Sequence, residues 1–481
     1  MSFETPLLLI AFFLLVTLVI GLSSIKIRMT FQEYAIGKKA FSTTTLVITL
    51  LASYYGGGIL ILNVTTFSSS NFFWIIWKFL INGLLLLTIS WLAGYMGKFM
   101  YHMSMPETMG RMYGKYTRMI TALLSIPYLI TFVTIQIKVM SQAINMCIAS
   151  NSYIVTIVAT TILCLYTMFG GIHSVTITDV WQFIVFFSII LILTWLTFKH
   201  LNQPMVETIS FLKMQKKFEL SISNIFFPFQ NKLLPILYYL SVIANIEPSI
   251  MQVVYMSASP SQAKIVFRYA AFVSCIIMAC ILLIGLFVFI KMSDLPSISV
   301  WDYILTTTSP NIRALICVCL LAMAMSTADS KLHTSAILIV YDLFGSIVRT
   351  KMDSVKQILL TRMTIVVVSI FAMLLSFHEQ FFPNLLSLLV STTCIYAVIV
   401  MAPFILAVLG FRIATPIAFM GMVTGISTLY AWQKWVSPMV GPTSGTFISI
   451  LANALFMLVG HYIRAKKLEK IVYFNKHLYK Y

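Results

Sequence analysis

Long apolar runs dominate the chain, and short polar segments interrupt them throughout its length. A helix needs about 20 predominantly apolar residues to cross the hydrocarbon core of a bilayer. By this measure the pattern predicts about 13 membrane-spanning helices. Their approximate ranges are 5–24, 43–66, 71–96, 117–147, 152–171, 179–199, 233–256, 267–291, 312–345, 361–378, 382–409, 414–433 and 443–464. We therefore expect an all-α polytopic membrane protein.

Composition supports this class and excludes several others. Of 481 residues, 60% are hydrophobic and 10% are charged, whereas a soluble domain has about 25% charged residues. The seven cysteines all fall in apolar stretches without metal-ligand spacing, which indicates small core residues. Walker, HExxH and glycine-rich nucleotide motifs are absent from the sequence. We predict no enzymatic activity and no cofactor.

The distribution of basic residues predicts the orientation. Most lysines and arginines outside the spans lie in the odd-numbered loops and the tail, and loops rich in these residues stay in the cytoplasm. The N-terminus is therefore expected outside and the C-terminus in the cytoplasm. The net charge of +18 then reflects topology rather than nucleic-acid binding, and affinity of the tail for anionic lipid is the weaker interpretation.

The first span does not resemble a cleaved secretory signal, because its flank lacks positive charge and contains Glu4. A membrane protein of this topology fits a bacterial inner membrane, and we expect it to function as a monomer.

Two spans contain residues that break helices. Gly56, Gly57 and Gly58 lie in the middle of the second span, and each glycine weakens a helix by about 1 kcal/mol relative to alanine. We favour an unwound stretch with free carbonyls over close helix packing through small residues. In the seventh span, the acid Glu247 precedes Pro248. This pair indicates either a cavity-lining break or a proline kink with Glu247 turned to a polar end.

The two breaks are five spans apart, one early in each half of the chain. This spacing is what two inverted five-helix repeats would produce. The expected organisation is listed in chain order: a leading helix and first cytoplasmic loop (1–42), the first repeat (43–199), an amphipathic external loop or short helix (200–232), the second repeat (233–409), two trailing helices (410–464) and a basic cytoplasmic tail (465–481).

The ninth span contains an unusual polar cluster. Ser326 and Thr327 are adjacent and flanked by apolar sequence, and polar groups in hydrocarbon cost free energy unless they find partners. Their hydroxyls are suited to a small hard cation. Asp329, Lys331 and His333 follow at alternate positions, so they cannot all share one helix face.

Several motifs together resemble the sodium:solute symporter family, the group of the sodium/proline, sodium/pantothenate and sodium/glucose carriers. The segment 166–182 resembles the family signature, and 31–39 and 105–114 resemble its first two cytoplasmic loops. The segment 322–330 is similar to its ninth-span motif, followed by the usual Tyr-Asp-Leu-Phe at 341–344. The resemblance implies the leucine-transporter-type fold, with one helix before the ten-helix core and two after it.

The resemblance also implies a sodium site between the second and ninth spans. Its ligands would be the carbonyls of Ala52, Tyr55 and Met323 with the hydroxyls of Ser326 and Thr327. Neutral oxygens suit sodium, which is a hard cation. Asp179 matches the acid that assists sodium release in this family. It could also cap the sixth helix, because Thr178 and Asp179 precede an apolar run.

The chain departs from the family pattern in two places. The family commonly has Gln-Arg at the cytoplasmic end of the seventh span, but here Gln252 is followed by Val253. The second place is the group Asp329, Lys331 and His333, which the family motif does not explain. Asp329 either enlarges a second cation site or pairs with a neighbouring helix.

These observations predict a sodium-coupled symporter that works by alternating access. We expect the solute to lie between spans two, four, seven and eleven. The residues expected around it are Tyr54, Tyr55, Gly57, Gln136, Glu247 and Tyr396. Tyrosines offer a ring face and a hydroxyl to a small amphipathic solute, and an amino acid or related metabolite is favoured.

Three alternatives remain. Asp179, Glu247 or Asp329 could titrate in a proton-coupled symporter of the same fold. A membrane sensor is disfavoured because the residues after the last span are too few for a kinase domain. A channel is disfavoured because the sequence has no repeated filter motif.

Overall fold

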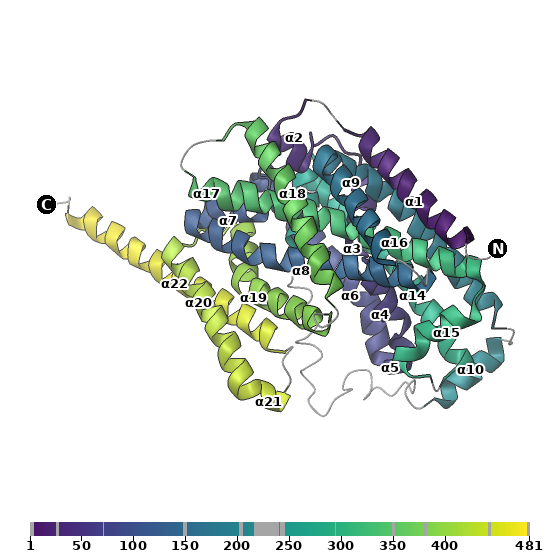
Figure 1. The fold of residues 1–481 in the computed structure, drawn as a ribbon. Coiled ribbons are helices and arrows are strands. Elements are labelled where there is room, and N and C mark those ends of the chain that lie inside the picture. Colours follow the sequence, from purple (N-terminus) through teal and green to yellow (C-terminus); the bar gives the residue numbers. More distant parts are fainter. Residues whose placement is uncertain are drawn as a thin grey trace.

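The computed structural model is helical throughout its described part, which comprises residues 4–25, 28–70, 72–147, 152–201, 205–215, 240, 246–293, 295–348, 352–378, 382–440 and 444–478. Figure 1 shows one bundle of long helices, with shorter helices at its ends. Eight long helices coincide with predicted spans: α1 (Glu4–Ser23), α6 (Phe72–Ala93), α8 (Lys115–Cys147), α14 (Pro260–Lys291), α16 (Pro310–Ile337), α18 (Ser354–Phe377), α19 (Phe382–Val408) and α22 (Ser444–Leu478).

The second predicted span is broken as expected. It consists of α3 (Thr43–Tyr54) and α4 (Gly57–Val64), followed by the short α5 (Thr66–Ser69). The segments on either side of the break are bent by 61°. The seventh span is interrupted where predicted, since Ile246 and Glu247 are non-helical and α13 (Pro248–Met256) begins directly after them. Most of this span before Ile246 lies outside the described residues.

The fifth and sixth predicted spans meet without a loop. They form one continuous element, α9 (Ser152–Lys199), of 48 residues. An unbroken helix of that length would measure about 72 Å, more than twice the hydrocarbon thickness of about 30 Å. Gly171 divides it, with φ 57° and ψ −146°. The predicted interval between 171 and 179 is therefore wrong, because the second helix begins directly after this single glycine.

The described residues contain nine helices that are long and apolar enough to span a membrane, or ten with the bent α3–α4 pair. This set counts α9 as one helix. It leaves out α20 (Thr415–Ala431), which continues through η6 (Trp432–Val436) into α21 (Ser437–Val440). The total of 13 spans stays a prediction.

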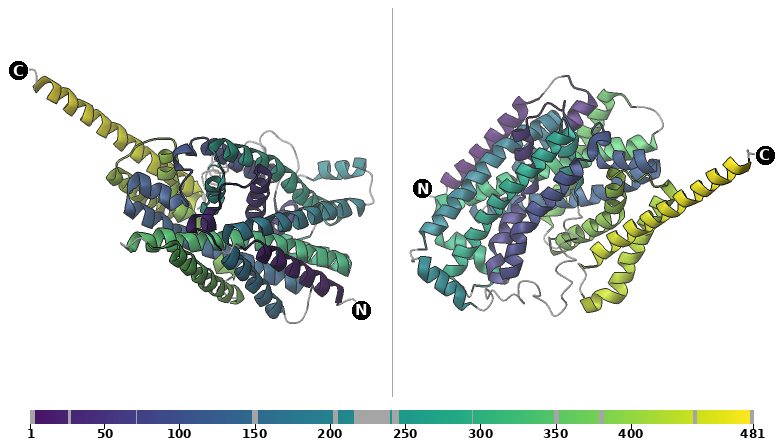
Figure 2. Two further views of the ribbon diagram at one scale, coloured as in Figure 1. Left: turned by 90° about the horizontal axis from the view of Figure 1, so that it is seen from above. Right: turned by 180° about the vertical axis from the view of Figure 1, so that it is seen from behind.

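α16 is the central helix of the bundle. It packs against α8, α9, α3, α1 and α18; Figure 2 shows the bundle from two further sides. Every residue from Ile316 to Ile337 is buried. A helix that also carries hydroxyls and charges can be enclosed in this way only if its polar groups meet partners. The trailing helices α20 and α22 pack with α19 at one side of the bundle (Figure 1).

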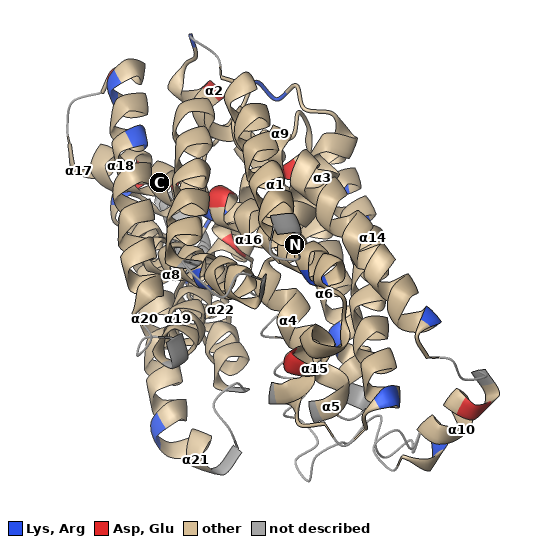
Figure 3. Cartoon of the chain, turned by 45° about the vertical axis from the view of Figure 1, so that its right-hand side comes forward, with Lys and Arg blue, Asp and Glu red and all other residues tan. Residues whose placement is uncertain are grey.

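Charged residues lie mainly near the two ends of the bundle, but a few occupy its middle beside α16 (Figure 3). Short capped helices order the loop motifs at one end. In α2 (Phe31–Ile36), Thr30 and Glu33 form a reciprocal capping box. In α7 (Met105–Tyr113), the Ser104 hydroxyl caps the helix and Pro106 occupies the first turn. The predicted external loop contains α10 (Met205–Met214).

We predict that Gly171→Ala destabilises the protein more than Gly410→Ala. Both glycines have positive φ, which costs other residues roughly 1–2 kcal/mol. A β-carbon at position 171 would also lie 2.8 Å from the Tyr34 carbonyl oxygen, whereas one at position 410 would meet no atom within 4 Å among the described residues beyond its chain neighbours. Thermal unfolding of the purified variants measures both effects, and equal losses would argue against Gly171 as a packed turn.

Candidate sodium and solute site

The break between α3 and α4 leaves a backbone carbonyl for the hydroxyls of α16. In a continuous helix the Ala52 carbonyl would accept a bond from the Gly56 amide. Here that amide donates to the Tyr54 carbonyl at 3.2 Å. Ser326 Oγ instead donates to the Ala52 carbonyl at 2.9 Å, and Thr327 Oγ1 lies 3.4 Å from the same oxygen. These hydrogen bonds thus connect Ala52 to residues that follow it by 274 and 275 positions in the sequence.

The remaining predicted ligands lie at the same place. The Met323 carbonyl oxygen is 3.2 Å from Ser326 Oγ. Tyr55 occupies the break itself, and its phenol turns away to bond Ser274 Oγ on α14 at 2.7 Å. Only the backbone of Tyr55 is therefore left to face an ion. The predicted ligands Ala52, Tyr55, Met323, Ser326 and Thr327 are all fully buried.

This set of oxygens suits sodium. It combines carbonyl and hydroxyl oxygens, all neutral, from two elements that meet at a helix break. Hard cations favour oxygen ligands. Neutral carbonyls and hydroxyls provide them without placing a fixed negative charge beside the ion. Broken helices near the middle of the membrane are where transporters bind their coupling ions.

Two buried carboxyl groups lie beside this set. Tyr166 on α9 donates to Asp329 Oδ2 at 2.7 Å, and the Ser330 amide donates to Asp329 Oδ1 at 2.6 Å. Asp179 faces Asp329, Ser330 and Ser53. Within the described residues, neither Asp179 oxygen has a donor at hydrogen-bonding distance. Ser53 and Ser330 share a hydrogen bond of 2.6 Å, which links this acid pair to α3.

Neither acid forms an ion pair with a basic group in the described part of the chain. Two negative charges in a low-dielectric interior repel each other strongly, so the pair requires a cation or a proton. The proposed capping role of Asp179 is wrong. It lies inside α9, eight residues after Gly171, rather than at a helix start.

The three alternating polar residues of α16 meet three different elements. Asp329 bonds to α9 as described. Lys331 pairs with Glu247 and lies 3.3 Å from Ser249 Oγ, both on the broken seventh span. His333 Nε2 donates to the Tyr34 carbonyl at 3.1 Å. The prediction that they cannot share one face is confirmed.

Three of the residues predicted to contact the solute gather around the second break. Tyr396 donates to the Ile246 carbonyl at 3.0 Å. Tyr54, Tyr128 and Tyr396 lie close enough to Glu247 to interact with it electrostatically. The Tyr128 and Tyr396 rings are stacked, with centroids 5.8 Å apart. This is an aromatic, polar-tipped environment for a small solute.

Gln136 and Gly57 lie at the first break. The Gln136 side chain packs against Gly56, and its Oε1 is buried without a partner among the described residues. Gly57 is packed closely, since a β-carbon there would lie 2.7 Å from Val139 and 3.1 Å from the Leu320 carbonyl. Glycine therefore serves close packing as well as the break. Their contact with a solute stays a prediction.

A family comparison decides what this site belongs to. The profile of the sodium:solute symporter family matches residues 34–425, which include both breaks, the acid pair and all of α16. The chain belongs to the sodium:solute symporter family. It is therefore a multi-pass membrane carrier of a small solute, coupled to sodium, and not an enzyme. No curated protein matches the chain.

Solved structures place the symporter in a known fold. A sodium-coupled sialic acid symporter, solved substrate-bound and outward-open, aligns with a TM-score of 0.82 at 16% identity, covering 96% of this chain and 97% of the other. A nucleobase-cation-symport-1 family transporter with bromovinylhydantoin bound aligns with a TM-score of 0.60 at 12% identity, covering 89% and 95%.

A manganese transporter from Eremococcus coleocola aligns with a TM-score of 0.52 at 10% identity, covering 90% of this chain and 95% of the other. At these identities the likeness establishes the fold, which is the leucine-transporter type.

Hydrogen bonds and an ion pair connect several helices of the symporter at the end of the bundle where α16 continues as a π-helix, η4 (Leu338–Phe344). Arg118 on α8 pairs with Asp342 at 2.7 Å, and Tyr341 donates to Glu107 at 2.9 Å. Gln252 on α13 donates to the Ala35 carbonyl at 2.8 Å. Gln252 thus joins α13 to α2 without the arginine that the family commonly places after it.

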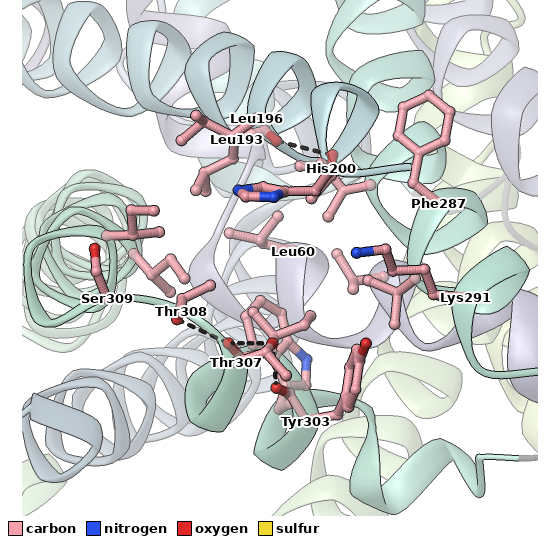
Figure 4. Close-up of a pocket in the computed structure, with 18 residues that line it drawn as sticks. Leu60, Leu193, Leu196, His200, Phe287, Lys291, Tyr303, Thr307, Thr308 and Ser309 are labelled. Carbon is pink, nitrogen blue, oxygen red and sulfur yellow. Dashed lines mark hydrogen bonds between the residues drawn. The ribbon is translucent and has the colours of Figure 1, made fainter. Parts of the chain in front are cut away.

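A separate cavity of about 400 Å³ lies toward the other end of the symporter. Its lining is mainly apolar, and the side chains of His200 and Lys291 both point into it (Figure 4). Ile316 is the lining residue of α16 nearest in sequence to Ser326, and ten helical residues span about 15 Å. None of the predicted sodium or solute residues lines this cavity.

Several polar and aromatic residues of the site were not predicted: Ser53, Tyr128, Phe132, Tyr166 and Ser330. Ser53 and Ser330 are each next in sequence to a residue that was predicted, so their positions could have indicated a part in the site. Tyr128 follows Pro127 inside α8, and an intramembrane proline beside a tyrosine was a second signal.

We predict that Ser326→Ala and Thr327→Ala each weaken sodium affinity at least about tenfold, which corresponds to about 1.4 kcal/mol per lost ligand. Thermal stabilisation of the purified symporter by sodium chloride, with choline chloride as the matched salt, measures this effect. Ser335→Ala is the control, because its hydroxyl bonds only within α16, to the Leu332 carbonyl. Equal sodium affinity in all three variants would refute the assigned ligands.

Proposed function

We propose that this symporter takes up a small organic solute by coupling its movement to sodium bound by Ala52, Tyr55, Met323, Ser326 and Thr327. The observation that carries the proposal is the contact of the two α16 hydroxyls with the Ala52 carbonyl at the helix break. Sodium at this place would hold the broken span against α16.

Coupling follows from the arrangement of the two breaks. Sodium favours the state in which the first break is closed onto α16, and the solute residues Tyr54, Gln136, Glu247 and Tyr396 lie around the two breaks. An ion that stabilises this state raises solute affinity, and the solute must raise sodium affinity by the same factor. Alternating access then carries both ligands across together. We assign Asp179 to sodium release, because it lies beside Ser53, the residue after the ligand Ala52, and has no hydrogen-bond donor among the described residues.

The environment supports an amino acid or related metabolite as the solute. Three tyrosines provide ring faces and hydroxyls, and Glu247 and Lys331 provide charges of both signs. A charged solute needs such partners in a site that excludes water. We further propose that the symporter is a monomer of a bacterial inner membrane, with its N-terminus outside and its C-terminus in the cytoplasm.

The acid pair supports a second candidate, a proton-coupled symporter of the same fold. Asp179 and Asp329 are fully buried beside each other, and a proton would neutralise the pair as a cation would. Sodium coupling is favoured because the carbonyl and hydroxyl oxygens at the first break can bind a metal cation but do not take up a proton near neutral pH.

Uptake into proteoliposomes distinguishes the two candidates. A solute is first identified by screening metabolites for sodium-dependent thermal stabilisation of the purified protein. We expect its uptake to follow an imposed inward sodium gradient and to persist with a protonophore. Uptake that continues without sodium, collapses with the protonophore and is abolished by Asp329→Asn would establish proton coupling instead.

A further inference from the structure

Lys331 and Glu247 form a buried ion pair between α16 and the second break. Lys331 lies four residues after Thr327, so about 6 Å of helix separates it from the sodium ligands. Glu247 is the last non-helical residue before α13. The pair therefore lies at the place where the solute is proposed to bind, and its partners belong to different elements.

The two partners differ in how accessible they are. The Lys331 side chain is 3% exposed, whereas that of Glu247 is 17% exposed. The Lys331 ammonium lies 4.1 Å from the centre of the Phe132 ring and 5.9 Å from that of Tyr128. Aromatic rings on α8 thus cover the pair on one side. Glu247 is the partner that an entering molecule would meet first.

A buried ion pair of this kind is weak evidence for stability. Apolar residues of similar size often replace such a pair without loss, whereas removing one partner leaves a costly unpaired charge. Lys331 also lies outside the residues that the family motif explains. The place of the pair beside the proposed solute residues therefore points to recognition rather than to stability.

We propose that Lys331 and Glu247 are the specificity residues of the solute site and that the transported solute is a zwitterion. Its carboxylate takes the place of Glu247 on Lys331, and its ammonium bonds to Glu247. This inference rests on the proposed function, since it assigns the solute class of the same carrier.

The exchange keeps every charge neutralised. The empty site holds one positive and one negative side chain bonded to each other. A zwitterion brings one charge of each sign, so both side chains keep a partner while the pair opens. A solute with a single charge would leave one side chain unpaired in a dry site, and an uncharged solute would have to bind beside a closed pair. The rings of Phe132 and Tyr128 would contact the uncharged part of the solute.

Opening the pair also frees the second break. The closed ion pair connects α16 to Glu247, the residue immediately before α13. Ser249 Oγ adds a further contact, 3.3 Å from the Lys331 ammonium. Sodium joins α16 to the first break, whereas the solute would loosen α16 from the second. The two ligands thus act on the same helix in different ways, which allows both to be required for a full transport cycle.

The test uses the full-length purified protein in saturating sodium chloride. The probes are the proteinogenic L-amino acids and glycine betaine, compared with monocarboxylates, alkylamines and uncharged sugars, and the readout is thermal stabilisation. We expect stabilisation by at least one zwitterion. Its amide and its N-acetyl derivative, which each lack one charge, should bind at least about 30-fold more weakly, equivalent to about 2 kcal/mol.

Variants separate recognition from structure. Lys331→Met combined with Glu247→Gln removes both charges, leaves neither unpaired, and should abolish stabilisation by the zwitterion while sodium still stabilises the protein. Lys331→Met alone should invert the preference, so that the cationic amide binds more tightly than the zwitterion. Lys78→Met is the matched control, because Lys78 is also within a span but bonds Thr66 Oγ1 at 2.8 Å.

Two results would overturn the inference. One is stabilisation only by uncharged or singly charged probes, or by none of the probes. The other is unchanged zwitterion affinity in the double variant, which would make the pair structural. A wild-type protein that sodium does not stabilise would count against the proposed function instead, so the two failures are distinguishable.

Discussion

The Ala52 carbonyl, which loses its helical donor at the first break, determines much of the surrounding structure. In hydrocarbon every backbone polar group needs a partner, because water is not available to supply one. Two hydroxyls of α16 take the place of the missing amide. This requires α16 to be polar at that level and to lie directly against α3. A cation bound here would take over as the partner of the carbonyl, while the hydroxyls turn their hydrogens away and offer their oxygens as ligands.

The burial of α16 follows from the same requirement. Its polar residues project in several directions and meet four elements between them: α3 for Ser326, α9 for Asp329, α13 for Lys331 and α2 for His333. Neighbours on every side are needed to satisfy them, so the helix is enclosed from Ile316 to Ile337. Its charges are specific contacts rather than a solvated face.

Much of the fold could be predicted from sequence because its determinants are local. Twenty apolar residues predict a span, and glycine or proline with a buried acid predicts a break. The gap expected before Asp179 was wrong, because one glycine at positive φ turns the chain without a loop. The pairing of Tyr166 with Asp329, and of Lys331 with Glu247, depends on which helices are neighbours and how each is rotated. Sequence spacing alone does not contain that information.

The separation of contacts around α16 has a consequence for how such carriers diversify. The hydroxyls of Ser326 and Thr327 and the ammonium of Lys331 lie on one helix but meet different partners, the Ala52 carbonyl and Glu247. Under the proposed assignment, a substitution at Lys331 would alter which metabolite is accepted while the sodium ligands stay unchanged. Solute preference could then change in a lineage without loss of sodium coupling, provided that positions 331 and 247 change together.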